Sequence, residues 1–342
     1  MPRRATAQDV ADLAGVSRST VSLVLNGRAD GNISATKQVR VIEAARQLSY
    51  RPNAVALSLR SQRSWAIGAL TWRGSAGFPE DLLHVAWHTA KAAGYLLMIM
   101  DTNDDRDHEG LAVTSLLDRQ VDGMVIVAPD LTEYRPPEAL AHTPMLLINC
   151  LDPDRTVVSI APDEVGASAS AAQILIDLGH SRIGLLADDT ATVQTEQRIL
   201  GAQAAAAAAG IPPLEIMVAG HEVATAYAMT EHRLAGPEPL TGLICTHERL
   251  AVGALLAATR KGLDIPGDLS IVSMEDGQHL ASGLVPAMAT DRRPDQPMAE
   301  QGIALLLRQL TSGGGLEPQQ LPFVCPVDLR ASVGPVPAGS SA

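Results

Sequence analysis

Aromatic residues are scarce in this chain. Phe, Trp and Tyr make up 3% of its 342 residues, whereas 46% are hydrophobic. The cores must therefore be built mainly from Ala, Val, Ile and Leu. Nothing in the sequence resembles the platform of aromatic side chains on which RNA-binding modules stack bases. A chain of this length is expected to fold into two or three domains.

Cysteines and long apolar runs are also few. Cys150, Cys245 and Cys325 are far apart and odd in number, which fits neither a disulfide framework nor a zinc cluster. The longest apolar runs are shorter than the roughly 20 residues that cross a bilayer. The N-terminus, MPRRATAQDV, lacks the apolar core of a signal peptide. We therefore expect a cytoplasmic protein with reduced thiols, no contact with the membrane, no cofactor and no metal.

Charge is distributed unevenly along the chain. Residues 1–63 contain ten Lys or Arg and four Asp or Glu, whereas the remaining residues contain sixteen and thirty-four, for a net charge of −12. A basic end on an acidic protein is typical of a nucleic-acid-binding segment, although a solvated basic terminus gives the same count.

The first part of the chain predicts a helix-turn-helix. Thr6 can N-cap a first helix, and Gly15 supplies the left-handed residue that ends it. Ser17 N-caps a second helix, SRSTVSLVLN, in which Val21 and Val24 share an inward face. Two helices joined by a tight turn with Gly form a helix-turn-helix, and the N-terminal part of the second helix then enters the major groove of DNA.

A third helix is expected after the polar loop GRADGN. Ser34 stands at its N-cap, and we expect Val39, Ile42, Ala45 and Leu48 on its buried face. The segment NAVALSLRSQRS that follows is long enough for only two helical turns. Such a helix is marginal alone, so it is expected to fold against a partner.

From Trp65 onward, strand patterns alternate with helical patterns. Segments such as WAIGALTW, YLLMIMDTN, GMVIVAP and MLLINCL predict buried strands. The alternation implies parallel sheets with helices on both faces. About nine strands are too many for one open sheet, so we expect two similar α/β lobes with a ligand between them at the carboxyl ends of the strands. The tail GPVPAGSSA is rich in Pro, Gly and Ser and is predicted to be disordered.

Two sequence blocks, DVADLAGVSRSTVSLVLN and ISATKQVRVIEAARQLSYRPNAVALSLRS, resemble the lactose-repressor (LacI/GalR) family of bacterial transcription regulators. LLDRQVDGMVIVAP, LIDLGHSRIGLL, QRILGAQAA and ERLAVGALLAATRKGLDIPGDLSIVSMED extend the likeness over nearly the whole chain. The resemblance implies an α-helical helix-turn-helix headpiece and a two-lobed α/β effector domain like a periplasmic binding protein. It also implies a homodimer on a near-palindromic operator.

The resemblance also implies domain boundaries. The headpiece would occupy residues 1–50, a hinge helix and linker 51–63, and the effector-binding and dimerisation domain 64–331. In that domain the N-lobe would comprise about 64–160 and 291–325, and the C-lobe about 161–290 and 326–331. A disordered tail would follow at 332–342.

The residues expected to contact DNA are Thr6, Ser17, Arg18, Ser19, Thr20, Leu23, Asn26, Leu59 and Arg60. The family commonly has Arg or another polar residue at the position of Leu23. Leucine offers only apolar contact, for instance to a thymine methyl, so Arg18 and Ser19 would carry more of the base reading. Leu59 matches the family leucine that wedges into the minor groove, although packing on its dimer mate would also explain it.

The residues expected to bind the effector are Trp72, Phe78, Asp152, Arg198, His247, Glu248 and Glu275. Arg198 in QRILG matches the family's ligand-binding arginine, with a surface ion pair as the alternative. Glu275 replaces the usual Asp, His247-Glu248 replaces Asn-Asp, and Trp72 either stacks on the ligand or caps the interface between the lobes. A sugar or sugar derivative is the expected effector, and a nucleoside or purine-type corepressor is the alternative.

A solute-binding protein or an enzyme with the same two lobes is the rival class. No GxGxxG, P-loop or GxSxG stands where a strand meets a helix. HVAWH, with His84 and His88, lacks the glutamate of HExxH, and HEVAT at His221 lacks a second histidine. A periplasmic receptor would need a signal peptide and no basic headpiece. The sequence therefore predicts a ligand-responsive repressor and not an enzyme.

Overall fold

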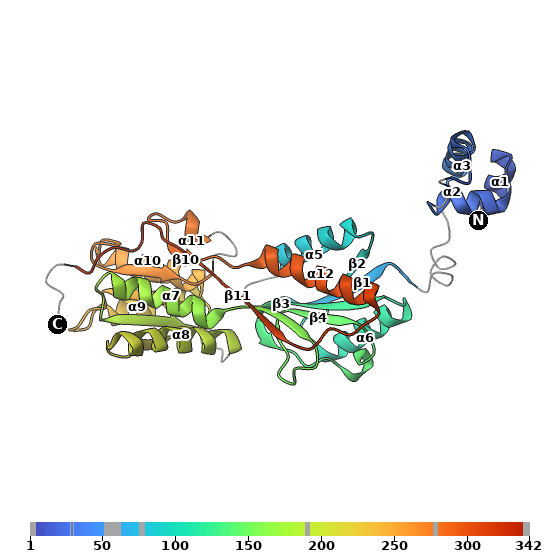
Figure 1. Cartoon of the computed structure of the whole chain (residues 1–342). Helices are drawn as coiled ribbons and strands as arrows, with labels where there is room; N and C mark the ends of the chain where they lie inside the picture. The colour runs from blue at the N-terminus through green and yellow to red at the C-terminus, as the bar shows by residue number, and fades with distance from the viewer. Residues whose placement is uncertain are drawn as a thin grey trace. The chain divides into compact units, whose positions relative to one another are not determined.

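The structure is a computed structural model that describes residues 5–27, 29, 31–50, 63–74, 79–188, 192–275 and 280–337. The chain divides into two compact units, Met1–Trp65 and Ala66–Ala342 (Figure 1). The predicted hinge helix at 53–61, with Leu59 and Arg60, lies outside the described residues, as does Phe78.

The first unit is a helix-turn-helix with a third helix packed on it. Its helices are α1 (Ala7–Ala14), α2 (Arg18–Leu25) and α3 (Ala35–Gln47). Thr6 caps α1 in a capping box, in which its Oγ1 accepts from the Asp9 backbone N–H and its own N–H donates to the Asp9 carboxylate at 2.7 Å. Gly15 has a φ of 62°, which ends α1 and opens the tight turn to α2. The predicted helix-turn-helix is thus confirmed.

The expectation for the buried face of α3 is wrong at two of its four positions. Val39 is 65% exposed and Ile42 is 56% exposed. The residues that pack are Val41, Ala44, Ala45 and Leu48. These positions follow the i, i+3, i+4, i+7 spacing of one helix face, which Val39 and Ile42 do not share. Ser34 occupies the N-cap position without a side-chain cap hydrogen bond.

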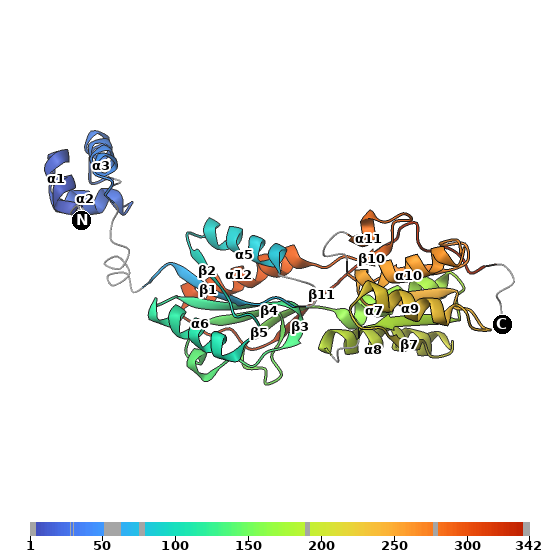
Figure 2. The same ribbon diagram turned by 180° about the vertical axis from the view of Figure 1, so that it is seen from behind.

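The second unit contains two six-stranded sheets, each with helices on both faces (Figures 1 and 2). The first sheet has the order β11-β5-β4-β3-β1-β2, and its paired strands are parallel. Its elements are β1 (Ala66–Thr71), α5 (Glu80–Ala92), β2 (Leu96–Asp101), α6 (Arg106–Asp118), β3 (Gly123–Glu133), the 3-10 helix η1 (Glu138–Leu140), β4 (Met145–Leu151), β5 (Val158–Pro162), α12 (Asp295–Ser312) and β11 (Gln320–Phe323). Helices α5 and α12 cover one face and α6 covers the other.

The second sheet has the order β12-β10-β9-β8-β6-β7. Its elements are α7 (Glu164–Asp177), β6 (Ile183–Ala187), α8 (Val193–Ala209), β7 (Glu215–Val218), α9 (Val223–Arg233), β8 (Gly242–Cys245), α10 (Glu248–Arg260), β9 (Ser270–Ser273), α11 (Leu280–Gly283), β10 (Ala289–Asp291) and β12 (Val327–Asp328). Helices α7 and α8 pack on one face, and α9 and α10 pack on the other. The expected two-lobed α/β fold is confirmed.

The chain passes between the two sheets after β5, after β10 and after β11. Two of these crossovers carry charged residues. Glu164 follows β5, and Asp291 and Arg293 lie at and after the end of β10. Because parallel strands in both lobes end near the crossovers, these charges are placed where α/β proteins bind ligands.

The prediction that 332–342 is a disordered tail is wrong for residues 332–337. Ser332 Oγ donates to the Ile271 carbonyl at 2.6 Å, and the Val336 N–H donates to the Leu178 carbonyl at 2.9 Å. The Gly334 carbonyl is 3.0 Å from Nε2 of the buried His180. Backbone groups of this segment are thus paired inside the second lobe, which outweighs its turn-rich composition. Residues 338–342 lie outside the described part of the chain.

Among the helices of the described residues, none is long and apolar enough to span a membrane.

Candidate functional site

The second helix of the headpiece presents a polar N-terminal end. Ser17 Oγ accepts from the Thr20 N–H at 3.1 Å, so the predicted cap of α2 is formed. Val21 is buried, whereas Arg18 and Ser19 are exposed. This end has the shape and polarity of a helix that reads base edges in the major groove.

Leu23 is 37% exposed and therefore does not belong to the headpiece core. Thr6 is exposed at the start of α1, and Thr20 is partly buried beneath Ser17. Asn26 Nδ2 donates to the Ser22 carbonyl at 2.7 Å, which ties this predicted DNA contact to the end of its own helix. The headpiece residues predicted to contact DNA thus lie on the outside or at the helix ends.

Arg40 holds the turn of the helix-turn-helix, and sequence reasoning missed it. Its Nη2 donates to the carbonyl of Ala14 and, at 3.2 Å, to that of Gly15. These carbonyls end α1 and have no partner within that helix. A basic residue in the second turn of α3 was the only available signal, and it does not reveal which distant carbonyls it meets.

In the second unit, Arg198 lies at the centre of a buried ion cluster. Its Nε donates to Glu164 Oε2 at 2.7 Å and its Nη2 donates to Glu164 Oε1 at 3.1 Å. Its Nη1 donates to the Thr246 carbonyl, and Nη2 lies 3.5 Å from Glu275 Oε2. Burial alone would lower the pKa of Arg198, but Glu164 and Glu275 raise it, so the guanidinium stays charged. The alternative of a surface ion pair is wrong, because both partners are buried.

Glu275 links Arg198 to the crossover after β10. Its backbone N–H donates to Asp291 Oδ1, and its Oε1 accepts from Arg293 Nη1 at 3.1 Å. Arg293 Nε donates in turn to Asp295 Oδ1 at 3.3 Å. Glu164, Arg198, Glu275, Asp291, Arg293 and Asp295 are called the charge network below. It joins α7 and α8 to the start of α12.

The carboxylates of the charge network are held in different states. Burial would raise the pKa of Glu275, but Arg293 and Arg198 lower it, so this group is ionised. Burial raises the pKa of Asp291 to about 6, against the lowering effect of Arg198. Asp291 Oδ2 is buried and has no hydrogen-bond partner among the residues that the structure describes.

A pair of histidines lies next to the network. The rings of His221 and His247 are 4.3 Å apart between centroids, and His221 Nδ1 is 3.6 Å from Asp188 Oδ2. His247 Nδ1 accepts from the Arg249 N–H at 3.2 Å, which leaves the proton of the neutral ring on Nε2. Burial lowers the pKa of His247, so this ring is neutral at neutral pH. Thr246 Oγ1 donates to Asp188 Oδ1 at 3.0 Å.

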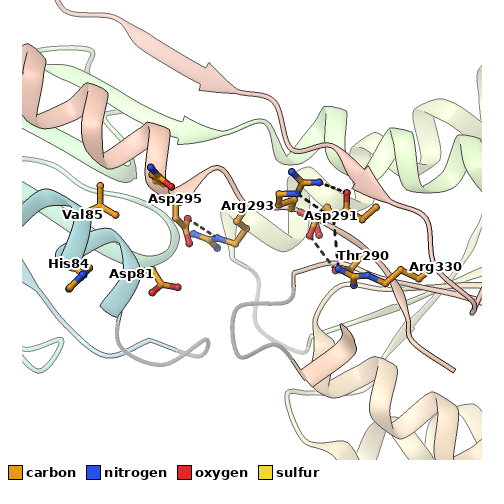
Figure 3. Close-up of a pocket in the computed structure, with 11 residues that line it drawn as sticks. Asp81, His84, Val85, Thr290, Asp291, Arg293, Asp295 and Arg330 are labelled. Atoms are coloured by element: carbon orange, nitrogen blue, oxygen red, sulfur yellow. Dashed lines mark hydrogen bonds and ion pairs between the residues drawn. The ribbon is translucent and has the colours of Figure 1, made fainter. Parts of the chain in front are cut away.

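An interlobe pocket of about 470 Å³ opens beside the charge network. In Figure 3, Asp81, His84 and Val85 of α5 lie on one side, and Thr290 and Arg330 lie on the other. Asp291, Arg293 and Asp295 belong both to its wall and to the charge network. The volume suits a small organic ligand, because ligand pockets typically measure about 300–1,000 Å³.

The structure brings Arg198, His247 and Glu275 together, but gives three other predicted effector residues partners within the protein. Trp72 stacks on Tyr134, with centroids 6.3 Å apart. The buried Asp152 carboxylate accepts from the Val157 N–H at 3.0 Å and organises the loop after β4. Glu248 is also buried, and its Oε2 accepts from the Leu280 N–H at 3.2 Å. These contacts give the three side chains structural roles.

Sequence reasoning missed most of the candidate site. The missed residues are Asp188, Glu164, His221, Asp291, Arg293 and Asp295. The neighbouring Asp163 has a structural role, because its carboxylate caps α7 by accepting from the Gly166 N–H at 2.9 Å. The signal for Glu164 was an acidic residue among small ones directly after a buried strand. Asp291 ends β10, a strand of three residues that is too short to recognise by pattern.

Within the described residues, no group of three or more His, Cys, Asp or Glu side chains is arranged to hold a metal ion.

A helix-turn-helix in one chain with two α/β lobes and a polar interlobe pocket defines a DNA-binding regulator that responds to a small molecule. Comparison with known families agrees. Residues 6–53 match the model of bacterial regulatory proteins of the lacI family, and residues 172–333 match that of a periplasmic binding protein-like domain. The chain belongs to the lacI family and is a transcriptional regulator.

Relatives and solved structures extend over almost the whole chain. The HTH-type transcriptional repressor PurR of Haemophilus influenzae (strain PittEE) is 27% identical over 311 residues, which cover 90% of this chain and 91% of the relative. PurR of Pectobacterium carotovorum (strain PC1) is 28% identical over 318 residues, with the same coverage. The lac repressor dimer bound to operator and the anti-inducer ONPF superposes with a TM-score of 0.80 at 23% identity, covering 97% of this chain and 100% of that one. The complex of the transcriptional regulator CelR with cellobiose superposes with a TM-score of 0.67 at 24% identity. The match covers 96% of this chain and 100% of that one.

Proposed function

We propose that this regulator is a cytoplasmic homodimeric repressor that binds a near-palindromic operator and acts by binding alone, without catalysis. The effector, a sugar or sugar derivative, binds in the interlobe pocket. The observation that carries the proposal is the exposed end of α2, with Arg18 and Ser19, in the same chain as a polar pocket whose wall includes Asp291, Arg293 and Asp295. The relatives support it, since one is an operator-bound dimer and another a cellobiose complex.

The pocket explains how a ligand can change the state of the chain. Its wall combines Asp81 and His84 from α5 in the first lobe with Asp291 and Arg293 at a crossover. A ligand that contacts both sides binds one arrangement of the lobes better than another. Only that difference in affinity shifts the population toward or away from the DNA-binding state. Hinge segments 51–63 of two protomers would then pair, or fail to pair, on the operator.

The direct test is the affinity for the operator with and without a ligand that stabilises the protein. The site is first found by selecting binding sequences from a randomised DNA library with the full-length protein. Two half-sites related by twofold symmetry are expected, since a symmetric dimer reads a symmetric sequence. A nucleoside or purine is the alternative ligand class, and the same titration distinguishes it from a sugar.

Leu23→Arg is expected to change base preference at one symmetric pair of operator positions, toward guanine. A bidentate arginine contact to guanine discriminates by about 1–3 kcal/mol, which leucine cannot supply. The fold should be kept, because Leu23 is 37% exposed. The measurement is a comparison of the base profiles that the variant and the wild type select.

The matched control is Ile42→Arg, which adds the same charge at a residue of α3 that is 56% exposed. It is expected to alter overall affinity through the phosphates without changing the base profile. An identical base profile for Leu23→Arg and the wild type would show that Leu23 does not face the bases.

A further inference from the structure

We propose that the effector carries a protonated amine and several hydroxyl donors, as an amino sugar does, and that the pocket rejects phosphorylated or carboxylated ligands. The inference rests on the proposed function in one respect, which is that the effector occupies the interlobe pocket. Its evidence is separate. It comes from which charges and hydrogen-bonding atoms around the pocket are already used by the protein and which are not.

The arginines in and behind the pocket wall are already used. Arg292 and Arg330 lie 2.6 and 3.8 Å from the Asp328 carboxylate. All three guanidinium nitrogens of Arg198 donate to protein oxygens. Nε and Nη2 donate to the Glu164 carboxylate, and Nη1 donates to the Thr246 carbonyl. Arg293 lies between Glu275 and Asp295, with contacts of 3.1 and 3.3 Å. An anionic ligand would have to take these donors from carboxylates that would then stay buried and unpaired. Such a displacement is unfavourable, because breaking a buried pair leaves an uncompensated charge.

The unused atom is an acceptor. Asp291 Oδ2 lacks a hydrogen-bond partner in the described part of the chain, and Asp291 lines the pocket. An unpaired acceptor favours a ligand that donates a hydrogen bond.

The charges are also unbalanced. Four aspartates line the pocket, against three arginines: Asp81, Asp291, Asp295 and Asp328, and Arg292, Arg293 and Arg330. Behind them, the buried carboxylates of Glu164 and Glu275 face the guanidinium of Arg198. The neutral ring of His247 does not offset the excess. Buried charge is unfavourable unless it is paired. An ammonium group supplies one positive charge and three donors, whereas a neutral sugar supplies donors only and an anion adds to the imbalance.

The first arm of the test measures thermal shifts of the full-length protein with matched compounds. Glucose, glucosamine, glucose 6-phosphate and glucuronate form one series, and the corresponding galactose compounds form a second. We expect stabilisation by the amine and little or none by its neutral and anionic counterparts at equal concentration. Equal or greater stabilisation by a neutral or anionic compound overturns the proposal. If that compound also changes operator affinity, the proposed function still stands.

The second arm needs no ligand. Asp291→Asn removes one charge and keeps an acceptor for the Glu275 N–H. At pH 8 the variant is expected to melt about 2–4 °C or more above the wild type, while Asp118→Asn, at an exposed residue of α6, leaves the melting temperature unchanged. An Asp291→Asn protein that melts at or below the wild-type temperature overturns the proposal. If no compound of either series binds, the melting temperature of Asp291→Asn decides alone whether the proposal stands.

Discussion

Arg198→Ala is expected to lower the free energy of unfolding of the second unit by about 3–5 kcal/mol, as removal of one partner from a buried ion pair does. The variant leaves Glu164 and Glu275 without the group that holds both of them, and all three side chains are buried. The measurement is urea denaturation of the full-length protein, followed by circular dichroism.

Two variants give this prediction its control. Arg198→Ala combined with Glu164→Gln should recover much of the loss, because glutamine leaves no unpaired charge behind. Arg292→Ala removes an exposed ion pair with Asp328, and such pairs contribute about 0–1 kcal/mol. If Arg198→Ala destabilises no more than Arg292→Ala, the charge network does not hold the site together.

Gly201→Ala is expected to destabilise the second lobe by about 1–3 kcal/mol, the range for overpacking. A Cβ at Gly201 would lie 2.1 Å from the Val165 carbonyl oxygen and 3.1 Å from the Ala169 nitrogen, which are backbone atoms of α7. To fit it, α7 must move away from α8, and this separates Glu164 from Arg198. Gly201→Ala should therefore lower both the urea concentration at the unfolding midpoint and the affinity for the ligand.

Gly110→Ala is the matched substitution. Gly110 lies in α6, and a Cβ there meets nothing within 4 Å. Alanine is a better helix former than glycine, so this variant should gain about 0.5–1 kcal/mol. If Gly201→Ala and Gly110→Ala change the free energy of unfolding in the same direction, the close approach of α7 and α8 does not depend on Gly201.

Local signals made the headpiece predictable. The caps at Thr6 and Ser17 and the turn at Gly15 are formed between residues no more than five apart. The face of α3 was not predictable in the same way, because apolar side chains occupy more than one face of this helix and only that of Val41, Ala44, Ala45 and Leu48 packs on the core. Arg40 likewise acts on carbonyls 26 and 25 positions away.

The site was predictable only where a motif marked it. Arg198 and Glu275 stand in recognisable segments, but Glu164 meets Arg198 from 34 positions away and Arg293 meets Glu275 from 18. Which carboxylate faces which guanidinium depends on how three crossovers pass between the lobes. Composition also predicted disorder for the end of the chain, but the Gly334 carbonyl contacts the ring of His180, 154 positions away.

The central claim is that a ligand in the two-lobed domain controls DNA binding by the headpiece. The measurement that tests it most directly is a titration of the selected operator with the full-length protein, with and without a compound shown by thermal shift to bind. We expect the ligand to change operator affinity about 5- to 150-fold, the range of typical allosteric coupling. A compound that saturates the protein and leaves operator affinity unchanged would contradict the account.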